Sequence, residues 1–287
     1  MTDVPAFERF LGIDWSGAKQ KRPKGIQVAV CDSGSAAPVL MTPPAAAAWS
    51  RDEVCDLVAS PGAGRTLVGM DFAFAYAFHD HLAYFPGLAD GPRDAPALWA
   101  FVEALNADQP DLYGAAAYAD PGSPVRGHYW TGGKRPQDFV ERRRVAERAA
   151  AEANAAPHPV FKVFSAANVG TGSLAGMRLL HRLHPAVSVW PFARPGAITV
   201  VEIYPKLYVR KAGVRAEKLV EHPDRIDATL AAYGSAPYDG PALDTEDKVD
   251  AVVSAAALRA LAGDPAVWAA PAREPAAGHE GWIFGVT

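Results

Sequence analysis

The apolar run at residues 66–74, TLVGMDFAF, constrains the fold more than any other feature of this chain. A run with so little polar alternation is typical of a strand that is buried on both faces of a parallel sheet. It follows a predicted helix at residues 50–60, in which Ser50 and Glu53 have the spacing of a capping box. A helix between two strands permits a parallel crossover, so the run predicts a strand that returns beside an earlier one.

Strand patterns on both sides of this run extend the predicted sheet. Three short segments before the helix predict an antiparallel meander, and they span residues 10–17, 26–32 and 38–42. A later apolar run at residues 198–204 ends at Pro205, which prevents normal strand continuation. The last strong helix is predicted at residues 245–261. We therefore expect an α/β fold whose mixed sheet joins an antiparallel three-strand meander to parallel strands, with helices on both faces.

The length of 287 residues is suited to one core domain with a substantial insertion. We expect residues 1–74 and 198–287 to form the core. Residues 75–197 are predicted to be a large, mostly helical insertion that acts as a lid or recognition region. Its predicted helices, separated by Gly- and Pro-rich turns, lie near residues 95–104, 136–153 and 173–184.

Composition and cysteine spacing indicate a folded protein without a disulfide framework, a zinc site or a membrane span. Hydrophobic residues make up 49% and charged residues 21% of the chain, which predicts a folded core rather than disorder. Cys31 and Cys55 show no CxxC spacing, so neither a disulfide framework nor a zinc site is indicated. No apolar run reaches the length of about 18 residues that a membrane span needs, and we expect a cytoplasmic protein without membrane contact.

Two aspartates occupy equivalent places in the predicted strands. Asp14 follows Gly12 at the end of the first strand, and Asp71 follows Gly69 in the parallel strand. Because strand side chains alternate, each glycine lies on the same face as its aspartate and leaves room for a helix or an ion. The alternative is that Asp14 only begins a turn and that Asp71 only caps the end of a strand. Two unpaired carboxylates on neighbouring buried strands are costly, however, and a hard divalent cation is the usual compensation.

The closing helix carries two more candidate ligands. Asp247 and Asp250 are three residues apart and face the same way, beside the apolar stripe of this helix. Acidic residues are also favoured at a helix start, which explains Asp247 better than Asp250. Glu202, inside the run at residues 198–204, is predicted as a further metal ligand, with a supporting acceptor or an edge residue as alternatives.

A net charge of −4 gives no global attraction for a polyanion, so any contact with nucleic acid must be local. The segment at residues 126–148 has more basic than acidic residues, although a solvated helix face would look the same. The predicted substrate-binding residues are Ser16 in the first turn and Lys134, Arg135, Arg142 and Arg143 in this segment.

The motifs at these positions resemble an uncharacterised bacterial family of predicted nucleases with the ribonuclease H fold, related to the Holliday-junction resolvase branch. They are GIDWSGA at residues 12–18, VGMDFAF at 68–74, VEIYP at 201–205 and DKVDAVVSA at 247–255. The resemblance covers the predicted core and not the insertion. It implies a ribonuclease-H-like sheet and one two-metal site made of Asp14, Asp71, Asp247 and Asp250. Asp71 departs from the resolvases, which usually have a glutamate there.

The resemblance implies hydrolysis of a nucleic-acid phosphodiester with Mg²⁺ or Mn²⁺ as cofactor. A phosphotransferase related to sugar kinases is an alternative, because these enzymes share the core and because residues 168–176 form a Gly-rich segment before a helix. A catalytically silent module that binds nucleic acid or protein is a third possibility, since a fold does not determine an activity.

Overall fold

The computed structural model describes residues 4–135, 139–164 and 169–287. The strands are β1 (Arg9–Asp14), β2 (Gln27–Asp32), β3 (Val39–Leu40), β4 (Thr66–Met70), β5 (Ser188–Val189) and β6 (Ile198–Glu202). The helices are α1 (Arg51–Ala59), α2 (Ala95–Leu105), α3 (Ala116–Ala119), α4 (Val145–Glu152), α5 (Val169–Leu183), α6 (Pro205–Lys211), α7 (Pro223–Ala232), α8 (Glu246–Leu261), α9 (Pro265–Ala269) and α10 (Ala277–Glu280). Short 3-10 helices are η1 (Arg126–His128), η2 (Leu219–Glu221) and η3 (Ala270–Arg273).

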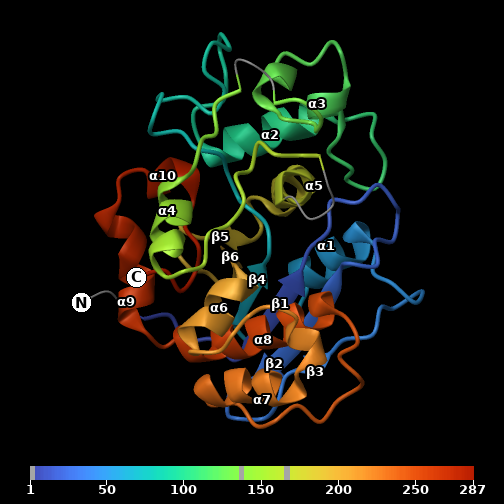
Figure 1. Ribbon diagram of the computed structural model, residues 1–287, viewed down its shortest axis with the longest axis vertical. Helices are drawn as coiled ribbons and strands as arrows, with labels where there is room; N and C mark the ends of the chain where they lie inside the picture. Colours follow the sequence, from blue (N-terminus) through green and yellow to red (C-terminus); the bar gives the residue numbers. More distant parts are fainter. Residues whose placement is uncertain (1–3, 136–138, 165–168) are drawn as a thin grey trace.

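The described strands form one six-stranded mixed sheet in the order β3-β2-β1-β4-β6-β5 (Figure 1). β1 pairs with β2 antiparallel and with β4 parallel, and β2 pairs with β3 antiparallel. On the other side, β4 and β5 both pair with β6 in parallel. The prediction of an antiparallel meander extended by parallel strands is confirmed, as is the capping box of α1 between Ser50 and Glu53.

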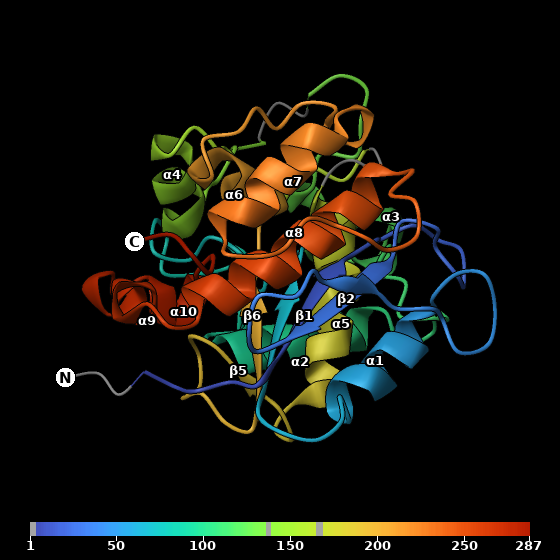
Figure 2. The ribbon, with the colours of Figure 1, turned by 90° about the horizontal axis from the view of Figure 1, so that it is seen from below.

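Helices cover both faces of the sheet, as predicted. Figure 2 shows α8 on one face, with α6 and α7 on the same side, and α1 and α5 on the other. Two hydrophobic clusters match this division, one containing Val54 of α1 and Leu174 of α5, the other containing Val252 of α8 and Leu207 of α6. The burial of β1 and β4 between these layers explains their apolar sequences.

Glycines allow α8 to lie unusually close to the central strands. A Cβ at Gly12 would be only 2.3 Å from the backbone oxygen of Ala251, and one at Gly69 would be 2.7 Å from Leu258 Cδ1. Gly12 and Gly69 are also direct neighbours in the register of β1 and β4. The expectation that these glycines leave room for a packed helix is therefore confirmed at both strands. The close approach places the first half of α8 against β1 and its second half against β4.

The strand containing residues 66–70 is shorter than the apolar run that predicted it. β4 ends at Met70, although residues 72–74 are buried. The N–H of Phe74 donates to Glu202 Oε2 rather than to a neighbouring strand, and the ring of Phe72 packs against Gly176 of α5. The chain therefore leaves the sheet after Asp71, and the apolar residues that follow pack against α5.

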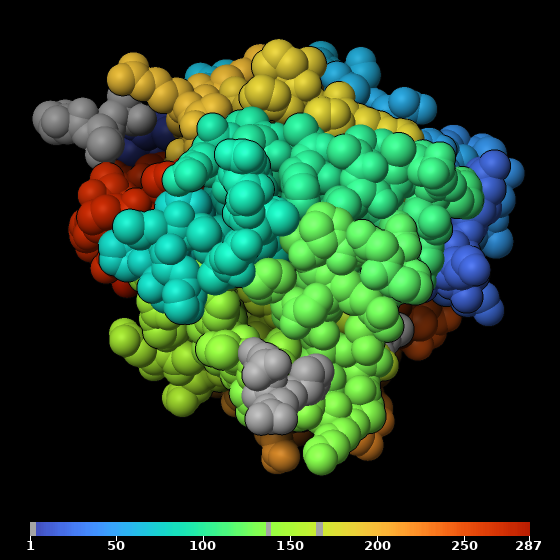
Figure 3. All heavy atoms as spheres, turned by 90° about the horizontal axis from the view of Figure 1, so that it is seen from above, coloured from blue at the N-terminus to red at the C-terminus, as the bar shows by residue number. Residues whose placement is uncertain are grey.

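Residues between β4 and β6 form much of one face of the molecule. Figure 3 shows this face, with residues 75–135 and 139–164 in the colours from teal to yellow-green. Within the predicted insertion, β5 joins the sheet beside β6, and α5 packs on the same hydrophobic cluster as β1. The helix expected at residues 136–153 begins only at Val145, and residues 136–138 lie outside the described residues.

In the part of the chain that the structure describes, no helix combines the length and the apolar character that crossing a membrane requires. Cys31 is buried and Cys55 is half-buried, and both are free thiols. Burial raises the pKa of the Cys31 thiol to about 11. Because the thiolate is the reactive form of cysteine, Cys31 is expected to be chemically inert at neutral pH.

Candidate active site

A pocket of about 730 Å³ opens at the carboxyl ends of β1, β4 and β6. Ligands in open α/β sheets commonly bind at this edge, where the strand ends and the loops that follow them meet. Asp14, Asp71, Asp247 and Asp250 all line the pocket. The structure thus brings together the four aspartates that the sequence analysis selected, from three separate elements.

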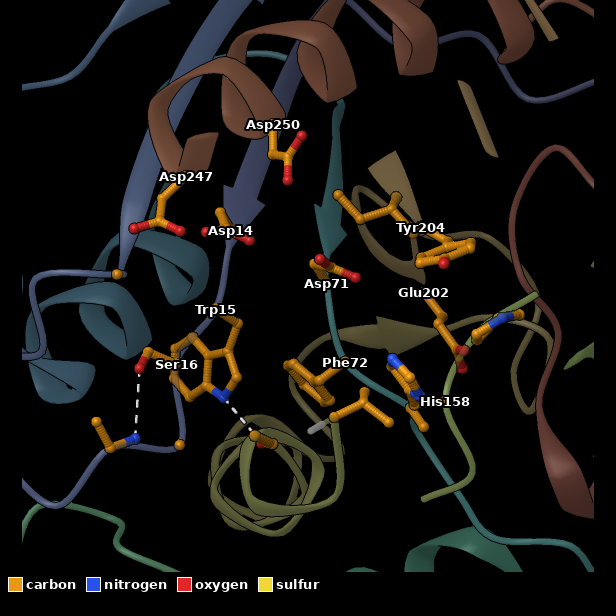
Figure 4. A pocket seen from close by; sticks show the side chains of 18 of the residues that line it. Asp14, Trp15, Ser16, Asp71, Phe72, His158, Glu202, Tyr204, Asp247 and Asp250 are labelled. Atoms are coloured by element: carbon orange, nitrogen blue, oxygen red, sulfur yellow. Dashed lines mark hydrogen bonds between the residues drawn. The ribbon is translucent and has the colours of Figure 1, made fainter. Parts of the chain in front are cut away.

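Two of these aspartates come from the central strands. Asp14 is the last residue of β1 and is 8% exposed. Asp71 follows β4 directly, and its N–H donates to the carbonyl oxygen of Ile13 at 3.0 Å, which extends the pairing of the strands by one bond. This pairing holds the two aspartates at neighbouring strand ends. In Figure 4 both side chains lie on the pocket wall.

The other two aspartates come from the first two turns of α8. The side chain of Thr245 caps this helix by accepting from the N–H of Lys248. Asp247 and Asp250 project from the helix toward Asp14, as Figure 4 shows. Helix geometry places residues three apart on one face, and the close packing of α8 on Gly12 brings this face over the strand ends.

The four carboxylates strongly perturb one another. Burial, followed by the charges of Asp71, Asp250 and Asp247, raises the pKa of Asp14 well above its usual range. Burial and the charge of Glu202 raise the pKa of Asp71 to about 7. The pKa of Asp250 is also raised well above its usual value, first by burial and then by Asp71, and burial raises the pKa of Asp247. Negative charge at this site is therefore unfavourable without a compensating cation.

No such cation comes from the described side chains. None of the four carboxylates forms an ion pair with a lysine or arginine within the described ranges. Carboxylate oxygens are the ligands that Mg²⁺ and Mn²⁺ prefer, so the donor chemistry fits these ions. The side chains do not form a ready coordination sphere, because no group of three or more His, Cys, Asp or Glu among the described residues is arranged to hold a metal ion. A bound ion would have to draw the carboxylates closer together.

The raised pKa values predict that stability without metal falls as the pH rises. The folded protein retains protons on these carboxyls that the unfolded chain has already lost, so each pH unit between about 4 and 7 lowers the free energy of unfolding. We expect the melting temperature in the presence of a chelator to decrease from pH 5 to pH 8, and millimolar Mg²⁺ or Mn²⁺ to oppose that decrease. Differential scanning fluorimetry measures both. A melting temperature that rises over this range would contradict the assignment of an uncompensated acidic cluster.

A loop after β1 forms another wall of the pocket, and a buried arginine holds it. Arg51, the first residue of α1, is 0% exposed. Its guanidinium donates to the carbonyl oxygens of Ser16 and Ala18, and to that of Asp111 from the segment before α3. The indole N–H of Trp15 donates to the carbonyl oxygen of Gly172 in α5 (Figure 4). The loop is therefore fixed by a donor from α1 and by an acceptor in α5.

Ser16 lines the pocket, as expected for a residue that contacts substrate. Its hydroxyl accepts from the N–H of Ala18 at 3.3 Å, which shapes the turn. The neighbouring Gly17 has no room for a side chain, because a Cβ there would lie 2.3 Å from the backbone carbon of Thr171. This contact brings the start of α5 to the pocket, where Val169 and Gly172 are among the lining residues.

Glu202, which the sequence predicts as a further metal ligand, lines the pocket and is paired with a buried arginine. Both of its carboxylate oxygens accept from the guanidinium of Arg144, with 2.7 Å between Arg144 Nη1 and Glu202 Oε2. Oε2 also accepts from the N–H of Phe74. Arg144 further donates to the side chain of Glu147 and to the backbone carbonyl oxygen of Glu280, so Arg144, Glu147 and Glu202 form a buried cluster of three side chains at the pocket wall. The sequence could not show this, because Arg144 lies 58 residues from Glu202.

The predicted basic surface at residues 126–148 is also corrected. Arg142 is 5% exposed, and its guanidinium binds Asp80 and the carbonyl oxygens of residues 77, 83 and 84. Arg143 donates to Glu141 and to the carbonyl oxygen of Pro157. Arg135 donates to the carbonyl oxygen of Phe139, and the exposed Lys134 lies outside the pocket. Most of these cations stabilise the fold internally, and none of them reaches the four aspartates.

The Gly-rich segment belongs to a helix rather than to a phosphate loop. Asn168 lies outside the described residues, and residues 169–176 form the first half of α5. A Cβ at Gly170 would be 2.2 Å from the carbonyl oxygen of Val160, and one at Gly176 would be 2.3 Å from the ring of Phe72. These glycines therefore serve close packing of α5 against its neighbours.

Sequence reasoning missed several residues of the pocket. Tyr204 and His158 lie across the pocket from Asp14 in Figure 4. Burial and the charges of Asp71 and Asp250 raise the pKa of Tyr204 to about 12, so its hydroxyl stays protonated, and it donates to the carbonyl oxygen of Ala156. The third missed group lies in the loop between β1 and β2 and consists of residues 20, 22 and 24. The run of basic residues in this loop could have indicated it from the sequence.

Comparisons of this chain with protein-family models, with curated proteins and with solved structures found no match. The functional argument therefore depends on the geometry and charge of the pocket.

Proposed function

We propose that this protein is a metal-dependent hydrolase that cleaves a phosphodiester of nucleic acid at the acidic pocket. The observation that carries the proposal is the meeting of Asp14, Asp71, Asp247 and Asp250 in one pocket without a described cationic partner. Four carboxylates from three elements are costly to bury for structural reasons alone. Divalent cations that also bind phosphate would offset this cost and would explain why the four carboxylates lie together.

The sheet supports a ribonuclease-H-like core as part of this proposal. The observed order β3-β2-β1-β4-β6-β5, with β2 antiparallel to both of its neighbours and β4 and β6 parallel to β1, agrees with the order that the resemblance implies. The closing helix α8 lies against β1, where its two aspartates meet that of the first strand. Residues 75–164 then form the region inserted between the central strand and α5, and α5 leads back to the parallel edge of the sheet.

In the proposed reaction, the chain itself supplies ligands, orientation and shape. Asp14, Asp71, Asp247 and Asp250 would hold Mg²⁺ or Mn²⁺, which would activate a water molecule and stabilise the leaving oxygen. Binding would displace the protons that the buried carboxyls retain near neutral pH, since only the ionised forms are good ligands. The loop fixed by Arg51 would keep Ser16 at the pocket wall beside the substrate.

The phosphotransferase alternative has weaker support. It needs a Gly-rich backbone that is free to bind phosphate groups of a nucleotide, whereas Gly170 and Gly176 are packed against Val160 and Phe72. The catalytically silent alternative does not explain why four mutually repelling carboxylates line one pocket. We therefore keep hydrolysis as the proposal, and the experiment below includes both alternatives.

The direct test incubates the protein with Mn²⁺ or Mg²⁺ and labelled single-stranded, duplex, hybrid and branched nucleic acids, and in parallel with ATP and sugars. We expect cleavage of at least one nucleic acid that depends on the metal and stops when a chelator is added. We also expect the metal to raise the melting temperature by mass action, because it binds the folded site and not the unfolded chain. ATP-dependent phosphorylation of a sugar would instead favour the phosphotransferase. Binding without cleavage, together with no thermal shift at millimolar metal, would favour the silent module.

A further inference from the structure

We propose that the loop between β1 and β2 binds the sugar-phosphate backbone of the nucleic-acid strand whose phosphodiester occupies the acidic pocket. This inference rests on the proposed function and names the substrate-binding surface of that same site. Residues 19–24, which we call the basic loop, read Lys-Gln-Lys-Arg-Pro-Lys. No acidic residue occurs between Asp14 and Asp32, so the basic loop has no acidic neighbour along the chain.

Three lysines of the basic loop are exposed and have no ionic partner in the part of the chain that the structure describes. Lys19, Lys21 and Lys24 are all exposed, and none forms an ion pair with a described acidic residue. Arg22 behaves differently, because its guanidinium forms a two-bond pair with Glu53 and also donates to the carbonyl oxygen of Ala48. Arg22 therefore anchors the basic loop to α1, and the three lysines remain available to a ligand.

The basic loop stands directly beside the acidic pocket. Gln20, Arg22 and Lys24 are among the residues that line it. The following Gly25 is so close that a Cβ there would lie 3.5 Å from Asp247 Oδ2. In Figure 1 the dark blue chain after β1 passes beside α1, and the hydrogen bonds from Arg51 to residues 16 and 18 fix its beginning. The loop therefore starts from an anchored position at the edge of the candidate site.

An acidic cluster and a group of lysines thus lie at and beside one pocket without pairing with each other. The aspartates need cations, and the lysines need anions. A phosphodiester substrate with divalent metal satisfies both, because the metal neutralises the carboxylates while the neighbouring phosphates neutralise the lysines. A small neutral substrate would leave Lys19, Lys21 and Lys24 without a role.

The alternative basic surface at residues 126–148 lacks these properties. Arg142 and Arg144 are buried and bound to Asp80 and Glu202, and Arg143 is paired with Glu141. None of the exposed cations of that segment lines the acidic pocket. Of the two basic segments, only the basic loop combines exposed lysines that lack an ionic partner among the described residues with an exposed lysine that lines the acidic pocket.

The test compares two variants that remove equal charge. One is Lys19→Ala/Lys21→Ala/Lys24→Ala, and the matched control is Arg126→Ala/Lys134→Ala/Arg135→Ala in the segment predicted earlier. Fluorescence anisotropy with a labelled oligonucleotide, in a chelator so that nothing is cleaved, measures the dissociation constant between about 50 and 200 mM salt. We expect the loop variant to bind about tenfold or more weakly, with a salt dependence shallower by about two units of slope. The control should remain within about twofold of the unchanged protein.

A charge-retaining variant, Lys19→Arg/Lys21→Arg/Lys24→Arg, should restore binding, because backbone phosphates accept from either cation. Unchanged affinity in the alanine variant, or weakened binding in the control alone, would overturn the inference. If the lysines serve only to neutralise the aspartates, the alanine variant would lose melting temperature in the chelator while its affinity stayed the same, which also overturns it.

The outcomes separate this inference from the proposed function. Lysine-dependent binding without any metal-dependent cleavage would sustain the binding surface and refute hydrolysis. The opposite outcome is metal-dependent cleavage of a small chromogenic phosphodiester together with oligonucleotide binding that does not depend on the three lysines. It would sustain hydrolysis and refute the binding surface.

Discussion

The Asp14→Asn variant is expected to lose at least about 100-fold of the metal-dependent hydrolysis while melting at the same temperature as the unchanged protein or higher. Asparagine keeps the size of the side chain and removes a charge that interacts with all three other aspartates. Its amide is a poor substitute for a carboxylate as a ligand of a hard cation. The loss of activity and the gain of stability therefore have one electrostatic cause.

The stability side of this prediction follows from the raised pKa of Asp14. Burial and the charges of Asp71, Asp250 and Asp247 disfavour its ionised form in the folded protein. Above the pKa of the unfolded chain, the wild-type residue therefore weakens the folded state, and asparagine avoids this penalty. The difference in melting temperature between the two proteins, measured in a chelator, should grow from pH 5 to pH 8.

Asp244→Asn is a suitable control because it removes an aspartate at the start of the same helix. Asp244 is exposed and pairs with Lys248, and an exposed pair of this kind contributes little to stability. We expect this control to keep its activity and nearly its full stability. Asp14→Asn with full activity, or with a large loss of melting temperature, would refute the central role given to Asp14.

Replacing Arg144 by methionine is expected to lower the free energy of unfolding by about 3 to 5 kcal/mol. Arg144 is 1% exposed and is the cation of a cluster that contains the buried carboxylates of Glu147 and Glu202. Methionine fills similar space but leaves both buried acids without a counter-charge. The cost is that of stranded buried charge, which greatly exceeds the value of an exposed ion pair.

Urea denaturation of three proteins would test this explanation. Arg143→Met removes the neighbouring arginine, which is partly exposed and paired with Glu141, and should cost at most about 1 kcal/mol. Arg144→Met/Glu147→Gln/Glu202→Gln removes the stranded charges and should recover part of the lost stability. The cluster would not act as one electrostatic unit if the triple variant were less stable than Arg144→Met by the summed costs of Glu147→Gln and Glu202→Gln.

Several features of the fold could be predicted because they depend on spacing along the chain. The apolar run that begins at Thr66 predicted a buried parallel strand, and Ser50 with Glu53 predicted the start of a helix. The glycine two residues before Asp14 indicated room for a helix or an ion beside β1, and α8 lies there. Strand alternation and helix periodicity translate such spacing directly into which face a side chain occupies.

The meeting of the four aspartates could be anticipated for the same reason. Parallel neighbouring strands bring their carboxyl ends to one edge, so Asp14 and Asp71 were expected together. Asp247 and Asp250 share a helix face by their separation of three residues. Whether that face points to the strand ends depends on the direction in which α8 crosses β1. The glycines permit the close packing of α8 on β1 but do not by themselves specify this direction.

The partners of the long charged side chains were decided only by the tertiary structure. Arg142 and Arg144 looked like members of a solvent-facing basic patch, yet Arg142 binds Asp80 and Arg144 binds Glu202, 62 and 58 residues away along the chain. The three lysines of the basic loop stayed free because the packed fold brings no described acid within ion-pair distance of them. A local pattern determines the direction of a side chain from its own strand or helix, whereas its partner depends on which distant segments the packed core brings within a few ångströms.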